Sequence, residues 1–497
     1  MPDNTAERTR IANVHPPTWE NPRAKGKYHL VVIGGGTGGL VTAAIAAGLG
    51  ARTALVERHW LGGDCLNVGC VPSKALLRAA RGWHAAATAH ERFGGPGVDR
   101  ERDFAAAVRR MQTIRADISA VDSAHRYRDM GVDVYFGQAR FTGTDILTVD
   151  GQSLRFRRAV IATGTRPAIP PIPGLADSGY LTNETIFSLT EVPGRLAVVG
   201  GGPIGAELAQ AFARFGSAVT ILQRDKRILG KDDPEAAGIV AAALVRDGVR
   251  ILTGATIQRV ERRQSIVIHV ARDGRAEELE ADAILIASGR VPNVEELGLD
   301  EAGVKCDQRR VITDDRLRTS NRRVYAVGDI TGRAPFTHVA DAHARMVVQN
   351  ALFFGRKKVT DLVIPWCTYT HPELAHVGMK WDASDKGGDK LASITIPLHD
   401  IDRARLDGEE EGFLRVRFRE GSDKIVAATL VANHAGDIIG QLSMAMRQGL
   451  GLSAIGSTIF PYPTDAEVIR KAADAWRKRK LSPRVRRLFH FYFRLAR

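Results

Sequence analysis

Two copies of one strand–turn–helix–strand pattern constrain the fold of this 497-residue chain more than any other feature. The copies are YHLVVIGGGTGGLVTAAIAAGLGARTALVER and RLAVVGGGPIGAELAQAFARFGSAVTILQR, and their second strands end at the matched positions Glu57 and Gln223. Glycines in such a turn let the backbone approach a pyrophosphate, which lies at the positive end of the following helix. Two copies in full context therefore predict two dinucleotide-binding units. Their turn glycines are Gly34, Gly36, Gly39, Gly200, Gly202 and Gly205.

The first of these units does not close before the second begins. A helical stretch at about 103–130 leads to RRAVIATGTRPAIPPIPG, a strand with a proline-rich exit, and the second unit ends in ADAILIASGRVPN, with a similar exit. We interpret the exits as paired chain crossings, which predicts an α/β fold with one Rossmann-like unit inserted in the other. Two strands around a polar turn in FLRVRFREGSDKIVAATLVA indicate a further α+β domain. The predicted ranges are an extension at 1–27, a first unit at 28–172 and 291–360, an inserted unit at 173–290, the α+β domain at 361–475 and a tail at 476–497.

The composition is that of an ordinary globular protein, with 44% apolar and 25% charged residues. Four cysteines are too few for a disulfide-stapled secreted scaffold, and they favour a reducing compartment. The N-terminal segment lacks the uninterrupted apolar run of a signal peptide, and no stretch approaches the ~18 apolar residues of a spanning helix. We therefore expect a cytoplasmic protein.

The positive charge is concentrated in the tail. Of the formal charge of +14, the segment from Trp476 to Arg497 supplies nine Lys or Arg residues and no acid. Its apolar residues recur at helical spacing after Ser482 and Pro483, which predicts a short basic amphipathic helix. Such a helix suits peripheral contact with an anionic membrane surface or docking on the protein's own dimer, and the sequence leaves both open. Nucleic-acid binding is not expected, because no recognised nucleic-acid module accompanies the basic residues.

The stretch CLNVGC places Cys65 and Cys70 five positions apart. In a regular helix their Cα atoms would be about 8.6 Å apart, whereas a disulfide needs less than about 7 Å. A bridge therefore requires a break in the helix, which Gly69 makes easier, while Pro72 suits a first helical turn. That turn would place Cys70 at a positive helix end, which favours a thiolate. A zinc site lacks two further ligands nearby and no metal is expected, a static staple is unusual for so short a loop, and a redox-active pair is the favoured interpretation.

Together these segments resemble the flavoprotein disulfide reductases, a family that includes glutathione reductase, dihydrolipoamide dehydrogenase and mercuric reductase. The resemblance covers about residues 28–475, in the family's order, through GGGTGG, GGDCLNVGCVPSK, ATGTRP, GGGPIGAE, ASGRVPN, AVGD and FPYPTDAE. It implies FAD in the first unit, a pyridine nucleotide in the inserted unit, and a homodimer formed through the α+β domain. The acceptor of the electrons is expected to be a small molecule or a metal ion.

The resemblance also implies roles for individual residues. Cys70 would be the charge-transfer thiolate that faces the flavin, and Cys65 the thiol that attacks substrate. Lys74 and Glu207 match the ion pair beside the flavin. The remaining expected cofactor-binding residues of the first unit and its exits are Glu57 for the ribose hydroxyls, Asp329 for the ribityl chain, Thr337 for the flavin edge, and Gly63, Thr163, Gly164 and Gly289 in the turn motifs.

The inserted unit has Gln223 where a ribose-binding acid is usual, followed by Arg224. Loss of the carboxylate removes repulsion of a 2′-phosphate, and an arginine can pair with that phosphate. The sequence therefore favours NADPH over NADH, with Arg224 as the expected contact.

Near the C-terminus the chain departs from glutathione reductase and dihydrolipoamide dehydrogenase. It has Tyr462 where their His-Pro-Thr-x-x-Glu motif has the histidine, and it keeps Glu467. A phenol is a poor general base at neutral pH, whereas thiols pass a soft metal ion between them without that proton transfer. Mercuric reductase also has tyrosine here, so we favour a mercuric-reductase-like enzyme, although its C-terminal cysteine pair is missing. The alternatives are a reductase of a small disulfide and a redox sensor or membrane-docked flavoprotein.

Overall fold

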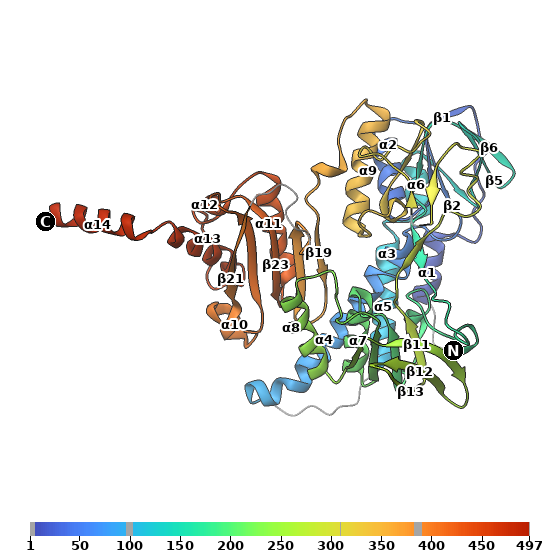
Figure 1. Ribbon diagram of the computed structural model, residues 1–497. Coiled ribbons are helices and arrows are strands. Elements are labelled where there is room, and N and C mark those ends of the chain that lie inside the picture. The colour runs from blue at the N-terminus through green and yellow to red at the C-terminus, as the bar shows by residue number, and fades with distance from the viewer. Residues whose placement is uncertain (1–4, 96–102, 309, 382–389, 497) are drawn as a thin grey trace. The chain divides into compact units, whose positions relative to one another are not determined.

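The computed structural model describes residues 5–95, 103–308, 310–381 and 390–496 (Figure 1). The chain divides into two compact units, residues 1–200, 214–218 and 257–362 in the first and 201–213, 219–256 and 363–497 in the second. The mixed α/β architecture confirms the predicted fold class. The division follows compactness rather than the nucleotide-binding repeats, and the predicted domain boundaries stay predictions.

The first unit is built on a seven-stranded sheet in the order β3-β2-β1-β6-β5-β4, with β18 also paired to β6. Neighbours are parallel from β3 to β6 and at β18, whereas β5 and β4 continue as antiparallel strands. The strands are β1 (Lys27–Ile33), β2 (Thr53–Glu57), β3 (Val132–Phe136), β4 (Arg140–Gly143), β5 (Ile146–Val149), β6 (Gln152–Ile161) and β18 (Val324–Ala326).

Both faces of this sheet are buried, as the continuous apolar runs of its parallel strands require. Along β1, Leu30 and Val32 belong to one apolar core, while Val31 and Ile33 belong to the core on the opposite face. The helices α2 (Thr37–Gly48) and α9 (Thr337–Leu352) pack against each other on this unit (Figure 1).

Two helices replace the single helical stretch expected at about 103–130. They are α5 (Phe104–Ser119) and α6 (Ala124–Asp129). The break occurs because the Ser123 hydroxyl accepts a hydrogen bond from the Arg126 N–H at 3.2 Å and so starts a new helix.

The paired chain crossings are present. The exit strands β7 (Thr165–Pro167) and β15 (Arg290–Pro292) are antiparallel partners. A hydrogen bond of 3.0 Å from the Ala168 N–H to the Gly289 carbonyl extends the ladder. The two exits therefore lie side by side, as their similar sequences predicted.

Smaller elements complete the first unit. Its β8 and β14 pair in parallel, β12 pairs with β13 and β16 with β17, both antiparallel. The bounds are α1 (Thr5–Val14), α3 (Gly63–Asn67), α4 (Cys70–Phe93), β8 (Arg195–Val199), β12 (Ile266–Arg272), β13 (Arg275–Ala281), β14 (Ala283–Ile286), β16 (Cys306–Asp307), β17 (Arg310–Val311), η1 (Ala176–Ser178), η2 (Ile186–Ser188), η3 (Gly328–Thr331) and η4 (Val359–Asp361). Three elements run across the division of the units, α7 (Pro203–Phe215), β9 (Ala218–Gln223), of which only Ala218 belongs to the first unit, and β11 (Thr256–Arg262).

The second unit contains the parallel pair β9 (Ala218–Gln223) and β10 (Arg250–Thr253), with α8 (Pro234–Arg246). Its largest sheet is antiparallel, in the order β19-β20-β23-β22-β21, and α11 packs on β20 and β23. The expected strand pair around the polar turn is β22 with β23. The bounds are β19 (Pro365–Thr368), β20 (Glu373–Gly378), β21 (Leu391–Pro397), β22 (Phe413–Arg419), β23 (Ile425–Ala432), η5 (Leu398–Asp400), α10 (Asp402–Asp407), α11 (Ala435–Arg447), α12 (Leu452–Ile455), α13 (Glu467–Arg479) and α14 (Pro483–Leu495).

Candidate active site

The first glycine turn is packed so closely that side chains would not fit. A Cβ atom on Gly34 would approach the Ala162 carbonyl oxygen to 2.4 Å, and one on Gly39 would approach the Gly34 carbonyl oxygen to 1.8 Å. Gly36 faces Gly63, where a Cβ would meet the Gly36 Cα at 2.7 Å. The turn therefore presents bare backbone at the start of α2, which fits the pyrophosphate of a dinucleotide.

Glu57 fixes the other side of this turn. Its carboxylate accepts hydrogen bonds from the N–H groups of Gly35, at 2.5 Å, and His59, at 2.7 Å. Burial raises the pKa of Glu57 against the lowering effect of these hydrogen bonds. Together, the closely packed glycines and the carboxylate at the end of β2 fit the adenosine half of FAD.

Gln223 repeats this arrangement in the second copy. Its Oε1 accepts from the Gly201 N–H at 2.7 Å, as Glu57 accepts from Gly35, and its amide donates to Asp225 at 2.9 Å. A Cβ on Gly202 would meet nothing within 4 Å, which leaves its backbone open to a ligand. Arg224 is exposed.

The helix breaks between the two cysteines, as the disulfide geometry required. The helix α3 contains Cys65, and α4 begins at Cys70 after Gly69, whose φ of −131° and ψ of −112° are not helical. Both cysteines are in the thiol form in this structure. The Cys70 sulfur lies 3.4 Å from the hydroxyl oxygen of Thr337, the first residue of α9. Cys70 is thus at the positive end of one helix and beside the start of another.

A hydrogen bond to Cys70 and burial together raise the pKa of the Cys65 thiol, and the Thr337 hydroxyl opposes them. Asp122, which sequence reasoning missed, adds a nearby negative charge, and burial raises the pKa of this carboxyl to about 6. Asp64, the neighbour of Cys65, instead pairs with Arg290. This charge pairing reduces the effect of the Asp64 carboxylate on the neighbouring thiol.

Arg290 connects Asp64 and Thr165 with Asp329, the residue expected to bind the ribityl chain. Its Nε donates to the Thr165 hydroxyl at 2.6 Å, and that hydroxyl donates to Asp329 at 3.2 Å. Burial raises the pKa of Asp329, while the charge of Arg290 and the hydrogen bond from Thr165 oppose the shift. The β7–β15 crossing thereby places Asp64 and Asp329 near one guanidinium group, that of Arg290. The Gly-Arg-x-Pro pattern at this exit did not indicate these contacts.

Asn293 holds the other turn at this crossing. Its side chain donates to the Thr163 carbonyl at 2.8 Å, and the Thr163 hydroxyl donates to the Asn293 carbonyl at 2.8 Å. The Asn293 N–H donates to the Gly164 carbonyl at 3.1 Å. Thr163 and Gly164 are therefore fixed by the second exit.

The N-terminal extension reaches the cysteine loop. Arg10 of α1 is 1% exposed, lies over the Trp60 ring and bonds to the Asn67 side chain, two residues after Cys65. Arg115 donates to the Asn67 carbonyl at 2.8 Å and to Glu7 at 2.8 Å. Burial works to raise the pKa of Glu7, but its hydrogen bonds and charge contacts with the two arginines outweigh burial and lower the pKa. We call Glu7, Arg10, Arg115 and Asn67 the N-terminal clamp.

The expected ion-pair residues Lys74 and Glu207 occupy defined places. Lys74 is four residues after Cys70 on α4, so both lie on the same side of the helix. Glu207 on α7 is buried, and its carboxylate accepts from the Tyr369 N–H at 2.9 Å. Their pairing beside a flavin stays a prediction.

Tyr462 and Glu467 lie in the second unit. The Tyr462 side chain is 70% exposed, and its hydroxyl donates to Asp402 at 3.1 Å, which raises the pKa of the phenol. Glu467 begins α13 and accepts from Arg470 at 2.7 Å. Its other carboxylate oxygen is buried and has no hydrogen-bond partner among the described residues.

Two family models match the chain. The description "Pyridine nucleotide-disulphide oxidoreductase" fits residues 28–344, and that family's dimerisation domain fits residues 364–473. The chain belongs to this family. It is an enzyme family that depends on FAD and a pyridine nucleotide, and the dimerisation domain supports a homodimer.

Individual relatives agree with this assignment. The mercuric reductase of Staphylococcus aureus is 36% identical over 452 residues, which cover 90% of this chain and 82% of that protein. The dihydrolipoyl dehydrogenase of Bacillus subtilis (strain 168) is 30% identical, with 90% of this chain and 97% of that protein covered. Among solved structures, the HOCl-induced flavoprotein disulfide reductase RclA of Escherichia coli has a TM-score of 0.81 at 30% identity, covering 90% of this chain and 99% of RclA.

Proposed function

We propose that this member of the family is an NADPH-dependent flavoenzyme that reduces a thiol-bound soft metal ion, as the name of its mercuric reductase relatives indicates for them. The observation that carries the proposal is the pair of adjoining thiols, Cys65 and Cys70, together with an exposed Tyr462 that is hydrogen-bonded to an acid. When bound, FAD supplies two-electron transfer between the nicotinamide and the cysteine pair.

The cysteine pair has the properties of a two-thiol metal ligand. Thiolates are soft ligands, and a thiol-bound Hg(II) ion can exchange its thiols for Cys65 and Cys70. Overall, NADPH, one proton and the Hg(II) dithiolate give NADP⁺, Hg(0) and two free thiols. The reaction needs NADPH and reduced thiols, so we place it in a reducing, cytoplasmic compartment.

The tyrosine favours a metal ion over a disulfide as acceptor. Reduction of a disulfide requires a proton for the leaving thiolate, and a histidine supplies it well near neutral pH. The hydrogen bond with Asp402 raises the pKa of Tyr462 above the usual value of a phenol. The Tyr462 hydroxyl therefore stays protonated and is a poor proton donor to a leaving thiolate. We propose that Tyr462 and Glu467 act at the partner subunit's cysteines in a homodimer, and that Lys74 and Glu207 form the ion pair beside the flavin.

Gln223 and Arg224 support NADPH as the electron donor. The Gln223 amide occupies the place that the Glu57 carboxylate has in the first copy, so it presents no negative charge to a 2′-phosphate. Arg224 is exposed beside it. Arg224→Ala should lower kcat/KM for NADPH by about tenfold and leave NADH nearly unchanged, because one charged hydrogen bond to the phosphate is lost. Equal losses with both nucleotides would contradict this assignment.

The decisive test measures NADPH oxidation with Hg(II) in excess thiol. We expect turnover in the wild type and none in Cys65→Ser. In that variant NADPH should still reduce the flavin. If NADPH reduces the flavin but Hg(II) gives no turnover, glutathione disulfide and lipoamide become the acceptors to test. If the enzyme reduces none of these acceptors, the result would favour a redox sensor.

A further inference from the structure

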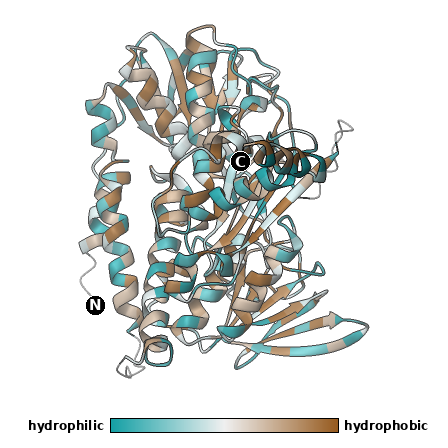
Figure 2. Cartoon of the chain, turned by 90° about the vertical axis from the view of Figure 1, so that its left-hand side faces the viewer, coloured by the Kyte–Doolittle hydropathy of each residue, from teal (hydrophilic) through white to brown (hydrophobic). Residues whose placement is uncertain are grey.

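The C-terminal helix α14 belongs to the second unit and has no extensive contact with another element among the described residues. None of its residues is buried, and Leu488, Tyr492 and Leu495 are 64%, 61% and 72% exposed. In Figure 1 it extends away from α13, and in Figure 2 it shows both strongly hydrophobic and strongly hydrophilic residues near the label C. The matched family domain ends at residue 473, before this helix.

The side chains of α14 separate into two faces. At 3.6 residues per turn, the apolar residues cover an arc of about 200° that only Arg484 interrupts. They are Val485, Leu488, Phe489, Phe491, Tyr492, Phe493 and Leu495. The opposite face carries Arg486, Arg487, His490 and Arg494. A wide aromatic face against a cationic one is typical of a helix that lies in a membrane interface.

The helix begins on a firmly held base. Trp476 of α13 is buried and donates to the Ser422 carbonyl at 3.3 Å, and Arg477 donates to the Gly456 carbonyl at 2.8 Å. The Ser482 hydroxyl then starts α14 by accepting from the Val485 N–H at 3.4 Å. The tail therefore projects from a fixed point of the dimerisation domain.

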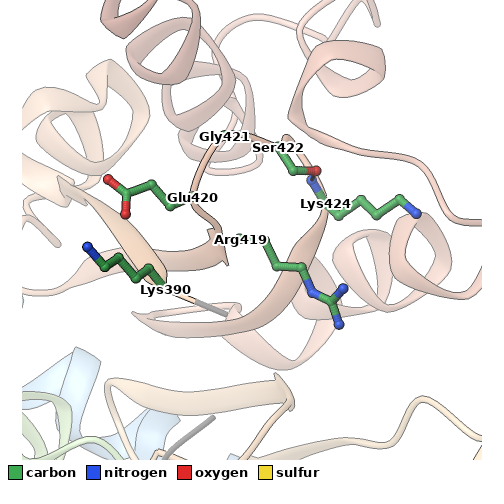
Figure 3. Close-up of a pocket in the computed structure, with 6 residues that line it drawn as sticks. All are labelled: Lys390, Arg419, Glu420, Gly421, Ser422 and Lys424. Atoms are coloured by element: carbon green, nitrogen blue, oxygen red, sulfur yellow. Dashed lines mark hydrogen bonds between the residues drawn. The ribbon is translucent and has the colours of Figure 1, made fainter. Parts of the chain in front are cut away.

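Further positive charges surround this base. A pocket of about 590 Å³ is lined by Lys390, Arg419, Glu420, Gly421, Ser422 and Lys424, so it shares Ser422 with the Trp476 contact (Figure 3). Three of the six lining residues are cationic and one is acidic. The base of the helix and the helix itself therefore carry the same sign of charge.

We propose that α14 anchors the enzyme to the surface of an anionic lipid bilayer. Its apolar face enters the interface, and the arginines of the opposite face contact anionic headgroups. The positive charge of the tail favours an anionic lipid surface as its binding partner, because the segment 477–497 has nine Lys or Arg residues and no acid. In the described residues no helix is long and apolar enough to cross a membrane, so the contact is peripheral.

The experiment is co-sedimentation of the full-length holoenzyme with vesicles of phosphatidylcholine alone or with about 30% phosphatidylglycerol. We expect binding only to the vesicles with phosphatidylglycerol, and release as salt is raised. Deletion of residues 482–497 should reduce the bound fraction by at least about tenfold without changing NADPH reduction of the flavin.

Point variants separate the two faces. Leu488→Ser with Tyr492→Ser removes apolar contact without a change of charge, and Arg487→Gln with Arg494→Gln removes two charges; each pair should weaken binding about tenfold. The matched control, Arg109→Gln with Arg128→Gln, removes two exposed charges elsewhere and should leave binding unchanged. Equal binding to uncharged vesicles, or binding that survives the deletion, would overturn the proposal. So would a dimer that dissociates when the tail is deleted, because α14 would then dock on the partner subunit.

Discussion

At the scale of single residues, the thiol chemistry of Cys65 depends on neighbours that are remote in sequence. The hydrogen bond with Cys70, burial and the charge of Asp122 raise the pKa of Cys65, while the hydrogen bond with Thr337 lowers it. Thr337 comes from α9, and Asp122 lies in the turn before α6. The carboxylate of Asp64, although adjacent in sequence, pairs with Arg290 instead.

Asp122→Asn should therefore make Cys65 more reactive. Removal of the negative charge lowers the Cys65 pKa and so raises the thiolate fraction at pH values below that pKa, and we expect alkylation to be about twofold faster. The difference should be present above about pH 6, where Asp122 is ionised. Alkylation of the reduced enzyme by iodoacetamide measures it, with Cys65 distinguished from Cys70 by fragmentation of the peptide that contains both. The exposed Asp117→Asn is the control, and an equal rate in both variants would contradict the assignment.

His343 should make the first unit sensitive to acid. It is 1% exposed, accepts the Gly328 N–H at 3.3 Å beside Asp329, and burial lowers its pKa to about 4. The unfolded chain, with a histidine pKa of about 6.5, takes up the proton first, so stability is complete above that pH and declines as pH falls toward 4.

Unfolding in urea should thus show a loss of about 2 kcal/mol from this group between about pH 7 and pH 5. His343→Gln, which can still accept the Gly328 N–H, should reduce the pH dependence by that amount. An unchanged dependence in the variant would show that His343 is not responsible.

At the scale of elements, the helix α1 is joined to the cysteine loop by the N-terminal clamp. Arg10→Ala would leave the Asn67 side-chain oxygen without its buried donor and Glu7 with Arg115 as its remaining partner, and it should lower the free energy of unfolding by about 3 kcal/mol. The matched control is Arg109→Ala on α5, whose ion pair with Asp103 is exposed and should contribute less than about 1 kcal/mol. Similar losses in the two variants, measured by urea unfolding, would show that the clamp is not a stabilising contact.

At the scale of the whole molecule, the dimerisation domain carries exposed apolar side chains. Among them are Ile459, which is 95% exposed, and Met444, which is 63% exposed. An exposed apolar surface on such a domain is typical of a subunit interface. The exposed Tyr462 lies close by in sequence, which agrees with a site completed by two subunits.

Tyr462→His should change the acceptor. A histidine near neutral pKa can protonate a leaving thiolate, so turnover of a small disulfide should rise at least about tenfold, while Hg(II)-dependent NADPH oxidation should change little. Both rates can be measured in one NADPH assay. Tyr462→Phe is the control, because it removes the hydroxyl without adding a base. A loss of Hg(II) turnover in Tyr462→Phe would show that the phenol takes part in metal transfer.

The local sequence determined the repeated units. Strand periodicity and turn glycines placed Glu57 and Gln223 at matched strand ends, because the backbone conformation of such a turn depends on its own residues. The break between α3 and α4 and the start of α14 at Ser482 also followed from nearby residues.

Only the tertiary structure decided the surroundings of those residues. The pairing of β7 with β15 brings Arg290 to Asp64, and α1 brings Arg10 to Asn67, over long separations in sequence. Burial and charge pairing act through space, so the pKa of Cys65, the neutralisation of Asp64 and the hydrogen bond of Tyr462 to Asp402 could not be derived from sequence spacing.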